Sequence, residues 1–203
     1  MIRILCTDIS SADEKVYKSL YENASDERKR RAERYRKYED KLRCVTSDAL
    51  LRSALKADDF QIYKNKYGKP YVKDRENFHY NLSHSGRYVV IAFGESEVGV
   101  DIQKHDSKTD IRMIAEQYFT SDEMEYIFQS NRGRSERFYE IWTGKESYLK
   151  YIGKGLYKSM KSFSILDWKQ EIRLLYPTEG YTMSLCTEDR EYTFELLDLR
   201  QLI

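Results

Sequence analysis

The stretch Trp142-Thr143-Gly144-Lys145-Glu146-Ser147-Tyr148-Leu149-Lys150 decides how the rest of the chain is interpreted. Glu146 and Lys150 are four residues apart, so a helix places both on one face. Trp142 is four residues before Glu146, which predicts an apolar anchor that holds this helix in a core. Gly144 inside a helix costs roughly 1 kcal/mol relative to alanine, which suggests a close neighbour or a ligand against the backbone. On this segment alone, a surface salt bridge between Glu146 and Lys150 is the simpler interpretation.

Length and composition favour a globular chain with an ordinary core. The chain has 203 residues, 40% hydrophobic and 34% charged, which suits a core under a charged surface. The formal net charge is +1, which argues against a nucleic-acid partner. No run approaches the ~18 apolar residues of a membrane span, so no membrane partner is expected. Three cysteines lack metal-ligand spacing, so free thiols in a reducing, cytoplasmic compartment are expected: Cys6, Cys44 and Cys186.

The first half predicts one strand, a long basic helix and then short antiparallel strands. Residues 2–9 begin like a strand, and Ser25 is a good N-cap for the helix. This helix carries a basic stripe, which is either a solvated face or a site for phosphates or an acidic partner: Arg30, Arg34, Lys37 and Lys41. Further strands are expected near residues 60–63, 71–72, 78–82, 88–93 and 98–102, in a hairpin pattern.

The second half repeats this order of helices followed by strands. Helix signals dominate from about residue 110 to 150, with a fresh start at Thr120 or Ser121. Strands are expected at residues 162–166, 171–176, 181–186 and 192–197. The repetition predicts an α+β fold of two similar lobes in one chain, each an antiparallel sheet packed with helices. We place the lobes at residues 1–98 and 99–203, with the seam near Gly99.

Two short motifs carry groups that could do chemistry. Asp101 lies near the end of an apolar strand, where a carboxylate is costly unless it is paired or bound to a metal. The simpler alternative is an aspartate that caps a turn. Ser83-His84-Ser85-Gly86 offers hydroxyl, imidazole and backbone N–H groups that suit a phosphate, although a polar loop is the simpler interpretation.

Taken together, these motifs predict an oxygen-ligand metal site beside a polyanion. Asp101 and Glu146 are hard ligands, too few for a complete cage, and Mg²⁺ often takes one or two carboxylates together with water and phosphate oxygens. Six basic residues are candidates for neutralising the phosphates: Arg28, Arg31, Lys69, His84, Lys145 and Lys150. The sequence has no P-loop and no dinucleotide fingerprint, so the phosphates are held in another way.

The motifs resemble a known family when they are taken in order. Gly99-Val100-Asp101-Ile102-Gln103 and then Trp142 to Lys150 resemble the paired signature of the 4'-phosphopantetheinyl transferases. Residues 25–31, 67–70 and 81–86 resemble the large, surfactin-synthetase-activating branch, so the resemblance spans nearly the whole chain. It implies a cleft between two lobes, where a Mg²⁺-dependent enzyme (Mn²⁺ being an alternative) moves the phosphopantetheine arm of coenzyme A to a serine of an apo acyl or peptidyl carrier protein, releasing 3',5'-ADP. It also implies a monomer.

The resemblance implies roles for individual residues. Asp101 and Glu146 correspond to the metal ligands, and Gln103 stands where a glutamate is usual. An amide ligand implies weaker metal affinity, and the alternative is that Gln103 only hydrogen-bonds nearby. Five residues correspond to contacts on the 3'-phosphate side of coenzyme A: Arg28, Arg31, Lys69, Ser83 and His84.

The resemblance also implies the catalytic groups. Lys150 corresponds to a lysine that reaches the pyrophosphate. The carrier serine is a weak nucleophile and needs a base, and Glu123 or Glu146 through a water are the candidates. The sequence does not choose between these two glutamates.

A second functional hypothesis remains open from the sequence. The basic segment of residues 28–43 fits a non-catalytic binder of an acidic partner or of nucleic acid. A milder version is a family member that binds coenzyme A without transferring its arm, which only Gln103 supports.

Overall fold

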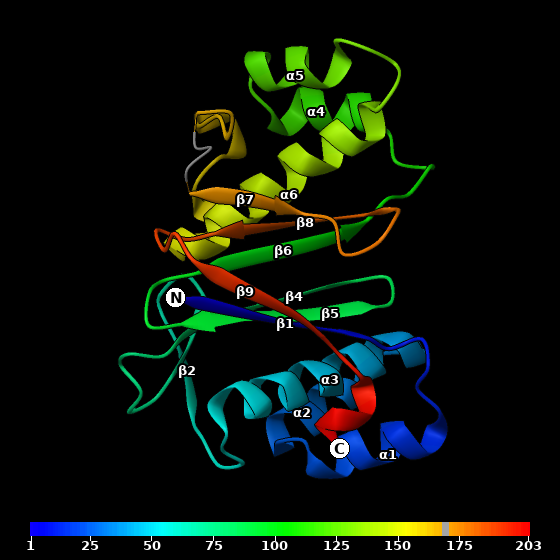
Figure 1. Ribbon diagram of the computed structural model, residues 1–203, viewed down its shortest axis with the longest axis vertical. Coiled ribbons are helices and arrows are strands. Elements are labelled where there is room, and N and C mark those ends of the chain that lie inside the picture. Colours follow the sequence, from blue (N-terminus) through cyan, green and yellow to red (C-terminus); the bar gives the residue numbers. More distant parts are fainter. Residues whose placement is uncertain (168–170) are drawn as a thin grey trace.

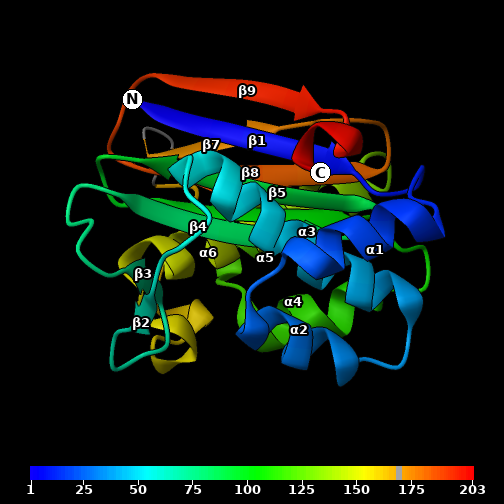
Figure 2. The same ribbon diagram turned by 90° about the horizontal axis from the view of Figure 1, so that it is seen from below.

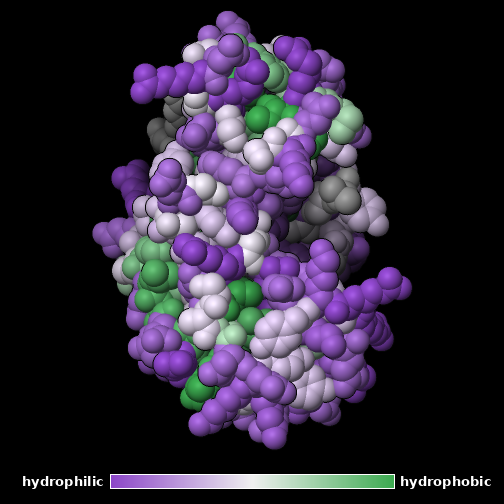
Figure 3. Space-filling model, turned by 90° about the vertical axis from the view of Figure 1, so that its right-hand side faces the viewer, coloured by the Kyte–Doolittle hydropathy of each residue, from purple (hydrophilic) through white to green (hydrophobic). Residues whose placement is uncertain are grey.

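The computed structural model describes residues 1–167 and 171–203. Two sheets lie face to face at the centre, and helices cover the outer side of each (Figures 1 and 2). The fold is therefore α+β, as the sequence predicts. One face of the molecule is mainly hydrophilic (Figure 3), as expected for a chain with 34% charged residues.

The N-terminal sheet has the strand order β4-β5-β1-β9. β1 (Ile2–Asp8) pairs antiparallel with β5 (Tyr88–Gly94), which forms a hairpin with β4 (His79–Ser85). Its outer face is covered by α1 (Glu14–Asn23), α2 (Asp26–Glu33) and α3 (Tyr38–Leu55), which share one apolar core with it. A separate hairpin, β2 (Ile62–Lys64) and β3 (Pro70–Val72), projects beside this sheet.

The long basic helix that the sequence predicts is two helices. Ser25 caps α2, its Oγ accepting a hydrogen bond from the backbone N–H of Arg28 at 3.4 Å. α2 ends at Glu33, and the extended backbone of Lys37 separates it from α3, whose first turn is acidic. The prediction of one continuous basic stripe is therefore wrong, because its four residues lie on two helices and the turn between them.

The C-terminal sheet has the order β6-β8-β7 and is antiparallel throughout. Its strands are β6 (Gly99–Lys104), β7 (Ile172–Leu175) and β8 (Tyr181–Cys186). Three helices pack on its outer side: α4 (Ile111–Tyr118), α5 (Ser121–Phe128) and α6 (Arg134–Ile152). Thr120 is the N-cap of α5, one of the two predicted positions. The strand predicted at residues 162–166 is absent, because the 3₁₀ helix Met160–Ser162 ends there and irregular backbone, a bend and a turn follow.

The last strand joins the lobe in which the chain begins. β9 (Tyr192–Leu197) pairs parallel with β1, and Thr7 Oγ1 donates to the carbonyl of Leu197 at 3.1 Å. The final 3₁₀ helix, Leu199–Leu202, packs into the N-terminal core through Leu199. Residues 192–202 were expected in the second lobe, and the structure instead places them on the first (Figure 1).

The two sheets meet where β4 lies beside β6. Asn81, Ser83 and Ser85 on β4 accept hydrogen bonds from every second backbone N–H of β6, at 3.0, 3.3 and 3.0 Å. Unpaired N–H groups along a buried strand edge are costly, so these side chains replace a missing strand partner. The seam between the sheets is therefore built from polar side chains, and the candidate site lies along it.

Candidate active site

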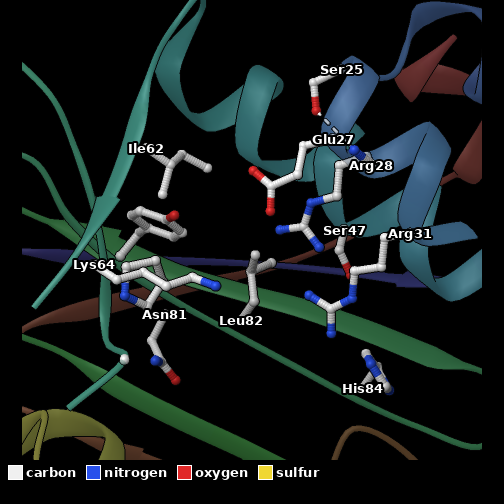
Figure 4. Close-up of a pocket in the computed structure, with 13 residues that line it drawn as sticks. Ser25, Glu27, Arg28, Arg31, Ser47, Ile62, Lys64, Asn81, Leu82 and His84 are labelled. Atoms are coloured by element: carbon white, nitrogen blue, oxygen red, sulfur yellow. Dashed lines mark hydrogen bonds between the residues drawn. The ribbon is translucent and has the colours of Figure 1, made fainter. Parts of the chain in front are cut away.

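A pocket of about 280 Å³ lies between α2, β2 and β4 (Figure 4). Arg28 and Arg31 enter it from α2, Lys64 from β2 and His84 from β4, so four basic groups point into one space. The apolar side chains of Ile62 and Leu82 also line it, together with Pro70 and Tyr80, and Glu27 adds one carboxylate. Basic groups and apolar side chains lining one pocket suit a phosphorylated nucleoside.

A buried aspartate on α3 fixes the start of α2. Asp48 is 1% exposed and accepts hydrogen bonds from the backbone N–H and the Oγ of Ser25, both at 3.1 Å. Its carboxylate also lies 3.6 Å from Arg28 Nε and from Arg52 Nε. Asp48 therefore holds Arg28 toward the pocket. The role of Asp48 was not predicted from the sequence, although an acid on the apolar face of α3 is a signal of such a role.

The electrostatics at His84 link the pocket to the seam. Its pKa is lowered, first by lost hydration and then by the nearby cations Arg43, Lys150 and Arg31. Arg43, which donates to the carbonyl of Gly86, was also missed by the sequence analysis. A neutral imidazole surrounded by cations indicates a place where an anion is stabilised.

On the other side of β4, Ser83 belongs to a second cluster at the seam. Asp101 Oδ1 accepts hydrogen bonds from Lys150 Nζ at 2.7 Å and from Ser83 Oγ at 2.8 Å. Lys150 Nζ also donates to the Val100 carbonyl at 3.0 Å. Ser83 is 7% exposed and does not line the pocket. The structure shows Ser83 holding Asp101, and its phosphate contact stays a prediction.

Glu146 faces this cluster without a partner of its own. Within the parts of the chain that the structure describes, no hydrogen bond or ion pair engages its carboxylate. Its pKa is raised, first by burial and then by the negative charge of Asp101, and Lys150 opposes this shift. Two neighbouring carboxylates, one of them unpartnered, make an arrangement that a cation stabilises.

Glycine allows α6 to approach the seam closely enough to place Glu146 and Lys150 there. A Cβ at Gly99 would lie 2.0 Å from the Ser147 carbonyl oxygen, so α6 rests directly on the β6 backbone. A Cβ at Gly144 would lie 2.4 Å from Ile165 Cδ1. The close neighbour that the sequence suggested for Gly144 is therefore a side chain of this protein.

The donor set at the seam fits Mg²⁺ rather than a transition metal. In residues 1–167 and 171–203 no three His, Cys, Asp or Glu side chains form a metal-binding group. Asp101 and Glu146 supply two hard carboxylates, which suits an ion that completes its shell with water and substrate phosphates. The Glu146 carboxylate, free of protein partners, is the group that such an ion would engage.

Two predicted site residues do not reach this cluster. Lys145 and Glu123 are each 0% exposed, and Lys145 Nζ lies 2.8 Å from Glu123 Oε2. Lys145 also donates to the carbonyls of Met160 and Phe163, and Glu123 accepts from the backbone N–H of Ile165. A charge enclosed in this way has no access to a phosphate or a carrier serine, so Lys145 is not a phosphate ligand and Glu123 is not the base.

Lys69 has a structural position at the seam. Its Nζ pairs with Glu97 and donates to the carbonyls of Val98 at 3.2 Å and Tyr151 at 2.8 Å. It thereby ties the β2–β3 hairpin to the end of α6, and its ammonium does not enter the pocket. Lys64 from that hairpin enters the pocket instead, and no pattern in the sequence marked it.

Comparison with known proteins assigns the chain to a class. Residues 11–96 match the family model described as "4'-phosphopantetheinyl transferase, N-terminal", and residues 97–196 match the "4'-phosphopantetheinyl transferase superfamily" model. The two matches meet beside the predicted boundary at residue 99. The chain belongs to this superfamily, and it is a transferase.

Individual relatives narrow the assignment. The chain is 34% identical to the 4'-phosphopantetheinyl transferase gsp of Aneurinibacillus migulanus over 210 aligned positions, covering 92% of this chain and 86% of the relative. It is 34% identical to the 4'-phosphopantetheinyl transferase Sfp of Bacillus subtilis over 189 positions, covering 83% and 84%. It therefore lies in the Sfp-like branch. A rat L-aminoadipate-semialdehyde dehydrogenase-phosphopantetheinyl transferase is 31% identical over 153 positions, covering 68% and 49%.

Proposed function

We propose that this chain transfers the 4'-phosphopantetheine arm of coenzyme A to a serine of an apo acyl or peptidyl carrier protein and releases 3',5'-ADP. One observation carries the proposal. His84 in the pocket and Ser83 in the seam cluster are consecutive residues of β4, so the strand joins an anion pocket to a lysine–carboxylate cluster. This arrangement suits a substrate with one phosphate at the nucleoside end and a pyrophosphate further along.

In this proposal, one part of coenzyme A binds in the pocket and another part binds at the seam cluster. The adenosine and the 3'-phosphate occupy the pocket, where Arg28, Arg31, His84 and Lys64 supply positive charge. The pyrophosphate lies along the seam at Lys150, beside Asp101 and Glu146. Mg²⁺, with Mn²⁺ as an alternative, is the proposed metal, and when bound it neutralises charge on the pyrophosphate oxygens.

The reaction then requires one bond to form and one to break. The carrier serine Oγ forms a bond to the phosphorus that bears the pantetheine arm, and the bond from that phosphorus to the bridging oxygen breaks. The bridging oxygen leaves as part of 3',5'-ADP, and Lys150 stabilises its charge. Glu146, beside the reacting phosphate in this proposal, accepts the serine proton through a water.

Several broader expectations belong to the same proposal. We propose that the protein acts as a monomer in the cytoplasm and that two lobes meet near residue 99, with residues 192–202 assigned to the first. None of the helices in residues 1–167 and 171–203 has the length and apolarity that a membrane crossing requires. The alternative of a nucleic-acid or acidic-partner binder is not supported, because the basic stripe is divided and the relatives are transferases.

Mass spectrometry of several apo carrier proteins, incubated with the enzyme, coenzyme A and Mg²⁺, tests the proposal. We expect each accepted carrier to gain the mass of one phosphopantetheine group. Glu146→Ala should lose this activity while unfolding at a similar temperature to the wild type, because no protein partner of its carboxylate is removed. Asp101→Ala should also lose the activity, at a lower unfolding temperature, because Lys150 loses its carboxylate partner. Glu22→Ala, which changes an exposed helical acid, is the matched control and should retain activity. No mass gain on any carrier would falsify the proposal.

A further inference from the structure

The two oxygens of Asp101 have different partners. Oδ1 accepts from Lys150 and Ser83, as described above. Oδ2 accepts from the carboxamide Nε2 of Gln103 at 3.1 Å. The other end of that carboxamide, Oε1, lies 3.3 Å from Ser85 Oγ. Gln103 is therefore held at both ends, between a carboxylate and a hydroxyl.

Hydrogen-bond chemistry fixes the direction of this carboxamide. Turning it over would place its oxygen against Oδ2 of Asp101, where two acceptors repel each other. Ser85 Oγ already accepts the backbone N–H of Lys104 at 3.0 Å, so its own hydrogen is directed to Gln103 Oε1. Gln103 therefore acts on Asp101 as a donor, and its oxygen is engaged by Ser85.

The cluster consequently has little negative charge with which to hold a cation. Asp101 and Glu146 each contribute one negative charge, and Lys150, 2.7 Å from Asp101, contributes one positive charge. The formal sum is a single negative charge. A glutamate at position 103 would double it. Because the charge count of the ligands tunes cation affinity, we expect this site to hold a free divalent ion only weakly.

We propose that Gln103 withholds a metal ligand and thereby makes divalent-cation binding conditional on coenzyme A. Gln103 donates to Asp101 and leaves the ion two protein carboxylates. The pyrophosphate oxygens of coenzyme A supply the remaining negative charge, so cation and coenzyme A bind as a pair. This inference rests on the proposed function, and it adds that cation binding depends on coenzyme A.

Mn²⁺ titration followed by electron paramagnetic resonance, without carrier protein, measures this directly. We expect free wild-type protein to leave Mn²⁺ in solution and coenzyme A-saturated protein to bind it. Gln103→Glu adds one charge at nearly the same size, and its free form should bind Mn²⁺ at least about tenfold more tightly than the free wild type. Gln103→Met, which has similar length without polar atoms, should leave free Mn²⁺ binding as weak as in the wild type.

The inference is overturned if the wild-type protein binds Mn²⁺ equally tightly with and without coenzyme A. This comparison needs no variant. Equal affinity of free wild type and free Gln103→Glu would also overturn it. Thermal unfolding gives a second measurement, because a ligand that binds the native state raises the midpoint. Calorimetry with coenzyme A and Mg²⁺ separates the two proposals. Absence of coenzyme A binding contradicts the proposed function, whereas coenzyme A binding with cation binding that does not depend on it contradicts the inference alone.

Discussion

Lys145 and Glu123 form an ion pair at 2.8 Å in which neither side chain is exposed. Burial lowers the pKa of Lys145, and the hydrogen bond from its ammonium to Glu123 opposes that shift. The pair joins α6 to α5, and Lys145 also holds the carbonyls of Met160 and Phe163. Lys145 thus fixes the helix whose next residue is Glu146, so it acts on the site by positioning.

Lys145→Met should strongly destabilise the fold, because it leaves the Glu123 carboxylate buried without its cation. Losing one partner of a buried pair typically costs about 3–5 kcal/mol of unfolding free energy. Denaturant unfolding followed by circular dichroism measures this loss. The double variant Lys145→Met/Glu123→Gln should lose clearly less than the sum of the two single variants, because it removes both charges.

An exposed pair provides the matched control. Lys18 lies 3.8 Å from Glu22, and their side chains are 74% and 63% exposed. Lys18→Met should leave the unfolding curve unchanged, because solvent screens an exposed pair. A similar loss for Lys18→Met and Lys145→Met would contradict the importance assigned to the buried pair.

Lys69→Met tests the connection between the pocket hairpin and α6. Lys69 is 7% exposed, and burial lowers its pKa while Glu97 opposes that shift. The variant removes the ion pair with Glu97 and the hydrogen bonds to Val98 and Tyr151. We expect lower stability and weaker coenzyme A binding, because the hairpin that carries Lys64 loses its attachment.

Calorimetry with coenzyme A and denaturant unfolding measure these two effects. Lys66→Met is the control on the same turn, since Lys66 is exposed and its ammonium lies 4.9 Å from the centre of the Tyr67 ring. It should match the wild type in both measurements. Unchanged coenzyme A affinity in a folded Lys69→Met variant would show that the hairpin holds its position without this lysine.

The sequence predicts those parts of the fold and site that depend on local pattern. Helix starts at Ser25 and Thr120 follow from capping chemistry, and the structure confirms both. The close neighbour expected at Gly144 is confirmed, because a Cβ there would lie 2.4 Å from Ile165 Cδ1. Glu146 and Lys150 share one face of α6, as helical spacing predicts, and the grouping of Asp101 with them is what the family resemblance implies.

What the sequence does not predict depends on contacts between distant segments. β9 joins β1 because an open sheet edge was available there, which no local pattern reveals. Lys145 and Glu123 carry charges that suggest a surface role, and only the packing of α5 on α6 shows that they neutralise each other. Ser83 was assigned to a phosphate because its hydroxyl suits one, yet the adjacent strand β6 engages it.

His84 should make coenzyme A binding depend on pH. Its pKa is lowered in the free protein, by lost hydration and by Arg43, Lys150 and Arg31, so the imidazole is neutral near pH 7. A 3'-phosphate beside it would favour the charged imidazolium and raise that pKa, so binding takes up a proton. Affinity should therefore rise as the pH falls from about 8 toward about 6, through the pKa of the complex.

Calorimetry with coenzyme A across this pH range, in buffers of different ionisation enthalpy, measures both the affinity and the proton taken up. His84→Gln keeps a polar side chain without a titrating ring, so its affinity should be lower and its dependence on pH shallower. The 3'-phosphate itself titrates at pH ~6, and this background is common to both proteins.

His105→Gln is the control, because the pKa of His105 is also lowered while its ring stacks on Tyr139 outside the pocket. Dephospho-coenzyme A, which lacks the 3'-phosphate, should bind the wild type with little pH dependence. An equal slope for coenzyme A in the wild type and His84→Gln would place the 3'-phosphate away from His84.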